Sequence, residues 1–272
     1  MVVWTIGTDT IRVEVTERVG VLTFNRADRR NALDDKMYVP MISAIERFAA
    51  DPDVGCIVVT GEGSAFCAGG DLRQGSGRQP DGAPPSREDR VANLIAKGRL
   101  SVVLRDAPII TIAAVNGPAV GAGLSIALAC DLRIAAASAK FIGGWSRLGF
   151  SGDFGGAWLL TQRVGPSKAL ELLATNATVT ADEALHFGMV DRVVPDDAFD
   201  RAWRDWAAVF AAGPQTALRL MKANVLDARR LSLTDAVAVE AERMVASSET
   251  ADHREAVRAG VERRPPRFGA GE

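Results

Sequence analysis

The sequence predicts an α/β fold with one large core and a helical C-terminal region. Two short apolar runs, 56–59 and 109–115, are bounded by turn-forming residues, as buried strands would be. The second run leads through a glycine turn into an unbroken helix-compatible segment, 124–129. The last quarter of the chain shows only amphipathic helical spacing, with no strand partner. We therefore expect a core at 1–195 and a helical region at 196–272.

Composition and charge are those of an ordinary globular enzyme. The 272 residues suffice for one large core, and 32 Lys and Arg against 34 Asp and Glu give a net charge of -2. This balance favours neither a nucleic-acid nor a membrane partner. The apolar stretch 107–137 is broken by Asn116-Gly117-Pro118, well short of the ~20 residues that a membrane span needs. Three cysteines without metal or redox spacing, and no evident signal peptide, predict a cytoplasmic protein.

The first 60 residues predict a strand meander, a helix and a buried strand. Alternating apolar side chains at 11–15 and 19–24 indicate strands, with Gly20 marking a turn. Asp34 is expected to cap a helix that runs to about Ala50. The apolar residues of this segment keep helical spacing. The first apolar run then supplies the next strand.

The middle of the chain alternates between predicted helices and strands. Residues 74–90 carry almost no apolar side chain and predict a loop, either a lid over the site or an insertion without function. A helix at 91–104 leads into the second apolar run, and strands are expected at 132–136 and 190–194. Thr180 and the glutamate three residues on form a capping-box pattern at a helix start. Further helices are expected at 156–164, 168–174, 198–211, 215–228, 233–247 and 252–262.

The stretch 115–131 carries the first candidate site. Gly121-Ala122-Gly123 separates the strand from the helix, and the first N–H groups of a helix have no partner within it. Small residues let a ligand approach the main chain closely. The pattern predicts an anion or oxyanion cradle, and tight helix–strand packing is the alternative. A second turn with adjacent glycines, Gly69-Gly70, exposes main chain in the same way.

The second candidate is Asp153, in a segment rich in glycine. Four aromatic residues surround it in the sequence, Trp145, Phe150, Phe154 and Trp158. Their contact would remove water and raise the pKa of Asp153 toward general-base values. The alternative is a structural N-cap for the following helix. A Ser–His–Asp triad at Ser125 is disfavoured because no oriented histidine is evident, and no carboxylate–histidine cluster suggests a metal.

Five segments occur in an order and spacing typical of one family. They are Asn25-Arg26 with Asn31-Ala32-Leu33, the run from Ala65 to Asp71, Ala114 to Gly117 with Gly121-Ala122-Gly123, Cys130-Asp131, and Gly165 to Ala169. Together they resemble the enoyl-CoA hydratase/isomerase (crotonase) superfamily, from about residue 10 to the C-terminus. The resemblance implies a crotonase-type spiral of ββα units with a C-terminal helical trimerisation region. It also implies a homotrimer or a dimer of trimers.

The resemblance further implies an acyl-CoA substrate and no cofactor apart from the coenzyme A that the substrate carries. The N–H groups of Gly70 and Ala122 would form an oxyanion hole for the thioester carbonyl, in agreement with the cradle predicted above. Arg73 would contact the CoA phosphates, with Arg30 and Arg263 as weaker candidates. The remaining candidates for substrate contact are Ala68, Asp71, Leu72, Gly121, Trp145 and Phe150.

The chain departs from the pattern of the family hydratases at two positions. Aligned without gaps from the Gly121 turn, the two hydratase glutamates fall at Ser125 and Trp145. Because each acid/base group contributes ~10²–10⁴ in rate, water addition by the usual mechanism should be badly impaired. Asp153 instead resembles the aspartate of dienoyl-CoA and ring-epoxide or oxepin-CoA isomerases. The Trp145/Asp153 pair is also similar to 4-chlorobenzoyl-CoA dehalogenases, but their histidine has no counterpart at 85–100.

We therefore expect an isomerase-type proton transfer through an enolate, with Asp153 as the proton carrier. Two alternatives remain open. One is an enoyl-CoA hydratase or a CoA-thioester hydrolase or dehalogenase that uses Asp153. The other is a non-catalytic acyl-CoA-binding protein, which the two missing glutamates favour.

Overall fold

A six-stranded sheet forms the centre of the protein. The computed structural model describes residues 9–73 and 85–269. The strand order is β1-β2-β3-β4-β6-β9, in which β1 and β2 are antiparallel and every other pair is parallel. The strands are β1 (Ile11–Thr16), β2 (Val19–Phe24), β3 (Cys56–Gly61), β4 (Ile110–Val115), β6 (Leu132–Ala136) and β9 (Arg192–Val194).

A second, three-stranded sheet has the order β5-β7-β8. Its strands are β5 (Ala119–Val120), β7 (Lys140–Ile142) and β8 (Thr178–Thr180). β4 is followed by β5 and then by the helix α3 (Ala122–Ala129), and β6 by β7 and then by α4 (Gly156–Thr175). Each of these units thus places one strand in each sheet before its helix. This repeat brings the start of α3 close to both sheets.

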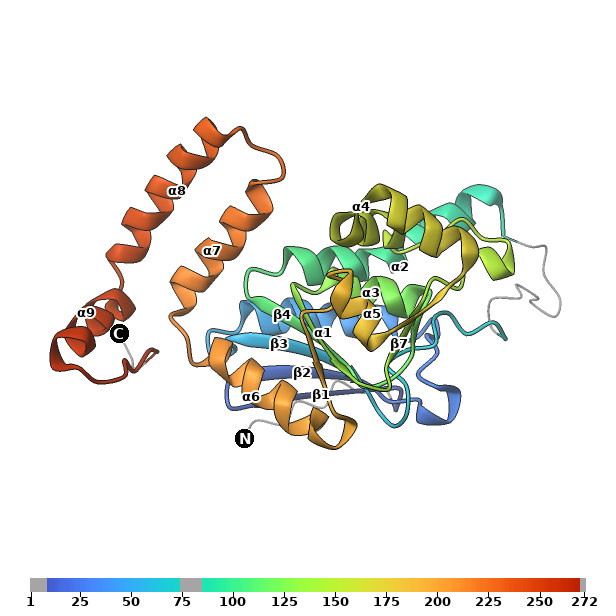
Figure 1. The fold of residues 1–272 in the computed structure, drawn as a ribbon, viewed down its shortest axis with the longest axis horizontal. Helices are drawn as coiled ribbons and strands as arrows, with labels where there is room; N and C mark the ends of the chain where they lie inside the picture. The colour runs from blue at the N-terminus through green and yellow to red at the C-terminus, as the bar shows by residue number, and fades with distance from the viewer. Residues whose placement is uncertain (1–8, 74–84, 270–272) are drawn as a thin grey trace.

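Helices cover both faces of the large sheet. One face packs against α1 (Tyr38–Ala50), α2 (Arg87–Asp106), α3 and α5 (Ala181–His186), and the other against α6 (Phe199–Ala211) (Figure 1). In β3, Ile57 and Val59 belong to the first core, and Cys56 and Val58 to the second. A strand buried on both faces reads as a continuous apolar run, which is why the sequence predicted it.

The last three helices extend away from this core (Figure 1). They are α7 (Gln215–Asp227), α8 (Leu233–Ser248) and α9 (Ala251–Glu262). The buried Lys222 ties α7 to the core, because its Nζ lies 2.6 Å from Asp131 Oδ2 and 3.0 Å from Ile109 O. Short 3₁₀ turns occur at η1 (Ala27–Arg29), η2 (Ser146–Leu148) and η3 (Asp196–Ala198).

The expected α/β class and the four C-terminal helices are confirmed, as is the capping box at Thr180. The division at residue 195 stays a prediction. α6 lies beyond that division but buries Phe199, Trp203 and Trp206 on the sheet. No helix within 9–73 and 85–269 is long and apolar enough to cross a bilayer.

Two predictions near the N-terminus were wrong. Gly20 lies inside β2, and the turn is made by Glu17 and Arg18, which adopt φ values of 50° and 65°. Asp34 does not cap α1, which starts at Tyr38 without a side-chain cap. The Asp34 carboxylate instead accepts a hydrogen bond of 2.7 Å from the main-chain N–H of Lys36.

The start of α2 also differs from the prediction. α2 starts at Arg87, because Ser86 Oγ accepts a hydrogen bond from Asp89 N at 3.0 Å, so the end of the expected 74–90 loop is helical. The rest of that loop, 74–84, lies outside the described residues, and with it the lid prediction. The two helical segments expected at 156–164 and 168–174 are confirmed: both lie within α4, and the backbone between them is non-helical at Gly165 (φ 76°, ψ 166°).

Candidate functional site

The turn that carries Gly69 and Gly70 is held in place by the polar segment before α1. Asn31 is fully buried and donates through Nδ2 to Glu62 O at 2.9 Å and to Ala65 O at 2.7 Å. Arg26 pairs with Asp71 across 3.0 Å, with both side chains largely buried. Arg26 and Asn31 therefore position a glycine turn that follows much later in the sequence.

Gly70 presents its main chain to open space. It forms a parallel bridge with Leu33, in which Leu33 N donates to Gly69 O at 2.8 Å and Asp71 N donates to Leu33 O at 2.9 Å. In such a bridge the N–H of the central residue faces away from the partner strand. Among the described residues the Gly70 N–H has no acceptor. A Cβ at Gly70 would meet no atom within 4 Å.

The start of α3 lies directly beside this turn. Ala122 is the first residue of the helix, so its N–H has no helical partner, and none is found elsewhere in the described chain. A Cβ at Gly69 would lie 3.7 Å from Ala122 N and 2.9 Å from Val120 O. Gly69 also adopts a φ of 86°. Only glycine fits there, and it brings the two predicted N–H donors together.

Asp153 lies half-buried in the segment before α4, and Trp145 holds its carboxylate. Trp145 Nε1 donates a hydrogen bond of 2.9 Å to Asp153 Oδ1. Burial raises the pKa of Asp153 above the ordinary aspartate value, and the indole hydrogen bond partly opposes this rise. The helix-cap alternative is wrong, because Gly155 is the N-cap of α4 and no side chain caps that helix.

Ser125 and Trp145 lie next to Asp153, and neither supplies a carboxylate. The buried Ser125 Oγ donates to main-chain oxygens, at 3.3 Å to Asp153 O and at 3.4 Å to Gly121 O. His186 and His253 are exposed, at the end of α5 and near the start of α9. The structure therefore offers Ser125 no histidine, and the triad alternative is wrong.

Asp153 lines a pocket of about 420 Å³ between α2 and the start of α4. It is the one carboxylate among the described residues of this lining. The α2 wall near it is made by Val91, Leu94, Ile95 and Gly98, none of which can act as an acid or base. This is the segment in which the dehalogenase resemblance requires a histidine.

Five of the other predicted contact residues lie near the turns of Gly70 and Ala122. Ala68 precedes the Gly70 turn, and its N–H donates to the carbonyl oxygen of Arg30, at the end of η1, at 3.0 Å. Arg73 follows the turn, and its N–H donates to Asp71 Oδ1 at 3.1 Å. Leu72 follows Gly70 by two residues and is exposed, and Gly121 directly precedes the buried Ala122.

Two of the predicted contact residues lie elsewhere. Phe150 is exposed and does not line the pocket. Arg263 ends α9, which lies far from α3 because α7–α9 extend away from the core (Figure 1). Within one chain, the structure does not bring Arg263 to the site.

Three residues at the site were missed. Tyr38, the only tyrosine of the chain, is buried with its ring 5.7 Å from that of Phe154. Burial, followed by the charges of Cys67, Asp35 and Asp153, raises the pKa of its hydroxyl. Ser101 and Arg105 line the pocket from α2. Their place on the pocket wall depends on how α2 packs against α4, which no local pattern reveals.

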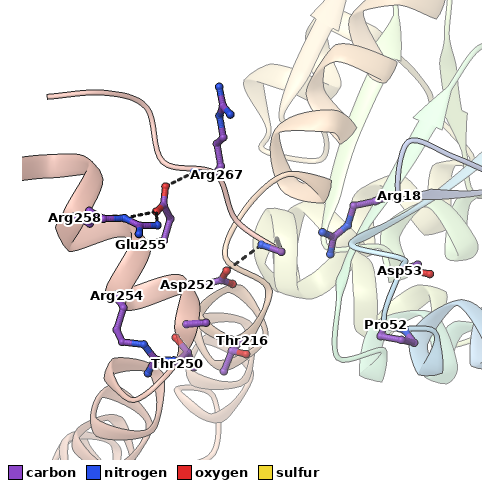
Figure 2. Close-up of a pocket in the computed structure, with 12 residues that line it drawn as sticks. Arg18, Pro52, Asp53, Thr216, Thr250, Asp252, Arg254, Glu255, Arg258 and Arg267 are labelled. Atoms are coloured by element: carbon purple, nitrogen blue, oxygen red, sulfur yellow. Dashed lines mark hydrogen bonds and ion pairs between the residues drawn. The ribbon is translucent and has the colours of Figure 1, made fainter. Parts of the chain in front are cut away.

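A second cavity, of about 680 Å³, lies between the C-terminal helices and the core residues Arg18, Pro52 and Asp53 (Figure 2). Glu255 there accepts hydrogen bonds from Arg264, Arg258 and the main-chain N–H of Arg267, which lower the pKa of its carboxyl. Asp252 accepts a hydrogen bond from Gly269 N. These pairs hold the segment from Arg264 to Gly269 against α9. The cavity contains none of the predicted site residues.

Within the described ranges, no group of three His, Cys, Asp or Glu residues could hold a metal ion.

A family model described as enoyl-CoA hydratase/isomerase matches residues 14–271. The chain is 36% identical to a probable enoyl-CoA hydratase of Rhodobacter capsulatus, covering 95% of this chain and 97% of the relative. It is 33% identical to a 1,2-epoxyphenylacetyl-CoA isomerase of Escherichia coli, covering 93% and 96%.

A solved structure shows the same architecture. The crystal structure of an enoyl-CoA hydratase from Polaromonas sp. JS666 superposes with a TM-score of 0.88 at 29% identity, covering 95% of this chain and 99% of that one. The likeness spans the ββα units and the C-terminal helices alike. It confirms the predicted spiral fold.

Proposed function

Because the chain belongs to the enoyl-CoA hydratase/isomerase family, we propose that it moves a proton between two carbons of an enoyl-CoA or related CoA thioester. The protein is an acyl-CoA enzyme of this family. The assignment as an isomerase rests on one observation: among the described residues that line the pocket, Asp153 is the one carboxylate. The positions of the two hydratase glutamates hold Ser125 and Trp145 instead.

The oxyanion hole is formed by main-chain groups. The thioester carbonyl accepts hydrogen bonds from the Gly70 and Ala122 N–H groups, which have no other acceptor among the described residues. Negative charge grows on this oxygen as a proton leaves the carbon chain. Fixed donors aimed at that charge typically contribute ~10²–10³ each in rate. The start of α3 adds its helix dipole in the same direction.

Asp153 carries the proton. Its ionised carboxylate takes a proton from one carbon, and the electron pair of that C–H bond enters the enolate. The carboxylic acid then returns the proton to another carbon of the conjugated system, which shifts the double bond. The Trp145 hydrogen bond holds Oδ1, so the pocket faces an oriented carboxylate. The raised pKa of Asp153 makes it a better base than an exposed aspartate.

The coenzyme A part of the substrate lies along the turn that carries Gly70. Arg73 and Arg30 are exposed on this turn and would meet the phosphates. Asp71 would repel the same phosphates, but Arg26 neutralises it across 3.0 Å. Ala68 and Leu72 complete the surface on either side of the donor.

Mass spectrometry in heavy water tests the reaction. The protein is incubated with 2-enoyl, 3-enoyl, dienoyl and aryl CoA esters, and each product is weighed and its double bond located. We expect deuterium uptake and a shifted double bond, without added water. Tight binding of every ester with no deuterium uptake would instead identify a non-catalytic acyl-CoA-binding protein.

Water addition is the second candidate function. The name of the Rhodobacter capsulatus relative, a probable enoyl-CoA hydratase, favours it. In this case Asp153 would have to activate water without a second carboxylate. The same experiment separates the two, because a hydratase product gains the mass of one water molecule.

We also propose that residues 196–272 serve self-association into a trimer or a dimer of trimers. The last three helices expose large apolar side chains, among them Val225, Leu233, Met244 and Val261. Such a surface is costly to leave in water. Native mass spectrometry of the full chain gives the number of subunits, and a monomer at micromolar concentration would contradict the proposal.

A further inference from the structure

Two arginines meet at one tryptophan at the end of the Asp153 pocket. The Arg105 guanidinium carbon lies 4.6 Å from the centre of the Trp158 ring, and that of Arg229 lies 5.7 Å from it. Within 9–73 and 85–269, neither guanidinium donates a hydrogen bond to an acceptor or has a carboxylate within 4.0 Å. Both guanidinium groups therefore lack a direct ion pair in the described chain, although the charges of Asp106 and Asp131 act on Arg105 from farther away.

The distance from Asp153 to this pair can be measured along α2. A Cβ at Gly98 would lie 3.8 Å from Phe154 Cα, so Gly98 faces the residue next to Asp153. Arg105 follows seven residues later, which corresponds to ~10 Å along a helix. Between them, the buried hydroxyl of Ser101 has no hydrogen-bond partner. The pocket thus has a carboxylate at one end and a guanidinium at the other.

A neighbouring cavity extends the positive charge beyond the pocket. It measures about 580 Å³ and shares Arg105 and Trp158 with the pocket. Arg229, Arg230 and Asp106 also line it, and Arg230 is already paired with Asp227. Burial, and then repulsion from Arg229, lowers the pKa of Arg105. An anion between the two arginines would relieve this repulsion.

We propose that the acyl group of the substrate ends in a carboxylate that Arg105 binds, so that the substrate is a CoA monothioester of a dicarboxylic acid. This rests on the proposed function, in which Asp153 contacts the acyl carbons near the thioester. The chain then continues through the apolar part of the pocket, past Gly98, to the guanidinium. Arginine matches a carboxylate with two parallel hydrogen bonds, and Trp158 keeps the guanidinium plane oriented.

The test compares two 3-enoyl-CoA esters of equal chain length, one ending in a methyl group and one in a carboxylate. We expect the parent protein to have the lower KM for the carboxylate ester. Arg105→Met keeps the aliphatic length but removes the charge. It should raise KM for the carboxylate ester roughly 10- to 100-fold, because a hydrogen bond to a charged group has about that effect. The kcat value, and both constants for the methyl ester, should change little.

Two further variants serve as controls. Arg230→Gln removes a nearby charge that Asp227 already neutralises, so the preference for the carboxylate ester should remain. Arg105→Lys keeps the charge and should restore part of the preference. Equal KM values for the two esters in the parent protein, or no effect of Arg105→Met, would overturn the proposal.

Two other outcomes distinguish carboxylate recognition by Arg105 from phosphate binding and from a failure of the proposed function. If Arg105→Met weakens the binding of free coenzyme A as much as that of the carboxylate ester, the arginine binds a nucleotide phosphate and the proposal is wrong. If neither ester takes up deuterium, the proposed function fails. Calorimetric binding of the two esters then still decides whether Arg105 recognises the carboxylate.

Discussion

Trp145 donates its indole N–H to the carboxylate of Asp153 across 2.9 Å. The two residues are eight positions apart and lie on either side of the η2 turn. The resemblance puts Trp145 at a position where family hydratases carry a glutamate, and we propose that this chain uses that position to orient a carboxylate placed elsewhere. In this proposal the residue at the expected glutamate position holds the proton carrier.

Replacing Asp153 by asparagine should lower kcat by ~10²–10⁴, because the amide cannot carry the proton. Binding of CoA esters should be nearly unchanged, since the side chain keeps its size and its acceptor for Trp145. Steady-state kinetics and calorimetry measure the two quantities. Asp182→Asn, at an exposed position of α5, is the matched control and should keep full activity. Unchanged turnover in Asp153→Asn would remove the aspartate from the mechanism.

The same variant should be more stable than the parent protein at neutral pH. Burial raises the pKa of Asp153 in the native state, so the native protein binds that proton more tightly than the unfolded chain does. Ionisation therefore costs stability as the pH rises through the native pKa. Asparagine does not ionise, and its advantage should shrink as the pH falls below the ordinary aspartate pKa. Thermal unfolding at several pH values measures this, and a constant difference would contradict it.

Trp145→Phe should shift the acidic limb of the pH–activity profile to higher pH. The indole hydrogen bond favours the ionised carboxylate and lowers the pKa of Asp153. Without it the base is protonated over a wider range, so activity is lost at a higher pH on acidification. The profile of kcat/KM against pH measures the shift. A shift to lower pH would mean that another group sets this limb.

The two adjacent glycines should respond differently to alanine. In Gly70→Ala the new methyl meets no protein atom, so the melting temperature should hold while the methyl obstructs the ester. We expect kcat/KM to fall up to roughly 100-fold, as for other misplaced substrates. In Gly69→Ala the φ of 86° and the close Val120 oxygen should lower stability by about 1–2 kcal/mol. If Gly69→Ala lowered kcat/KM and Gly70→Ala lowered the stability instead, the assignment of the N–H donor to Gly70 would be wrong.

Lys222→Met should lower the free energy of unfolding by ~3–5 kcal/mol, because it leaves Asp131 without its buried partner. Denaturant unfolding measures this loss. The exposed pair Arg201–Asp205 is the control, and Arg201→Ala should cost less than about 0.5 kcal/mol. Equal losses of unfolding free energy would show that the buried Lys222–Asp131 pair stabilises the fold no more than the exposed Arg201–Asp205 pair does.

The sequence predicted the fold best where burial is most uniform. β3 and β4 are covered on both faces, so their apolar runs identify them without knowledge of their neighbours. Helix starts were less predictable. Asp34 has the residue type of an N-cap, but its carboxylate closes a local turn onto Lys36 and the helix begins later. The competition between these two hydrogen bonds cannot be read from the residue type alone.

The candidate site was predictable where the main chain carries it. Adjacent glycines and a helix start indicated the turns of Gly70 and Ala122, and the structure brings these turns together. Arg105 gave no such signal, since an arginine near the end of a helix is usually a solvated surface residue. Its meeting with Trp158 depends on the packing of α2 against α4, which joins residues more than fifty positions apart.

The bridge to Leu33 leaves the main-chain N–H of Gly70 free to serve as a donor, so this part of the proposed site does not depend on any side chain. Both proposed donors are amide hydrogens, so no substitution other than proline deletes them, and side chains around them can change while the ester stays polarised. Selection for a new reaction can therefore act on three inward positions, Ser125, Trp145 and Asp153, one at a time. Intermediates in such a series would keep a partly working centre, which makes new chemistry reachable by single-residue steps.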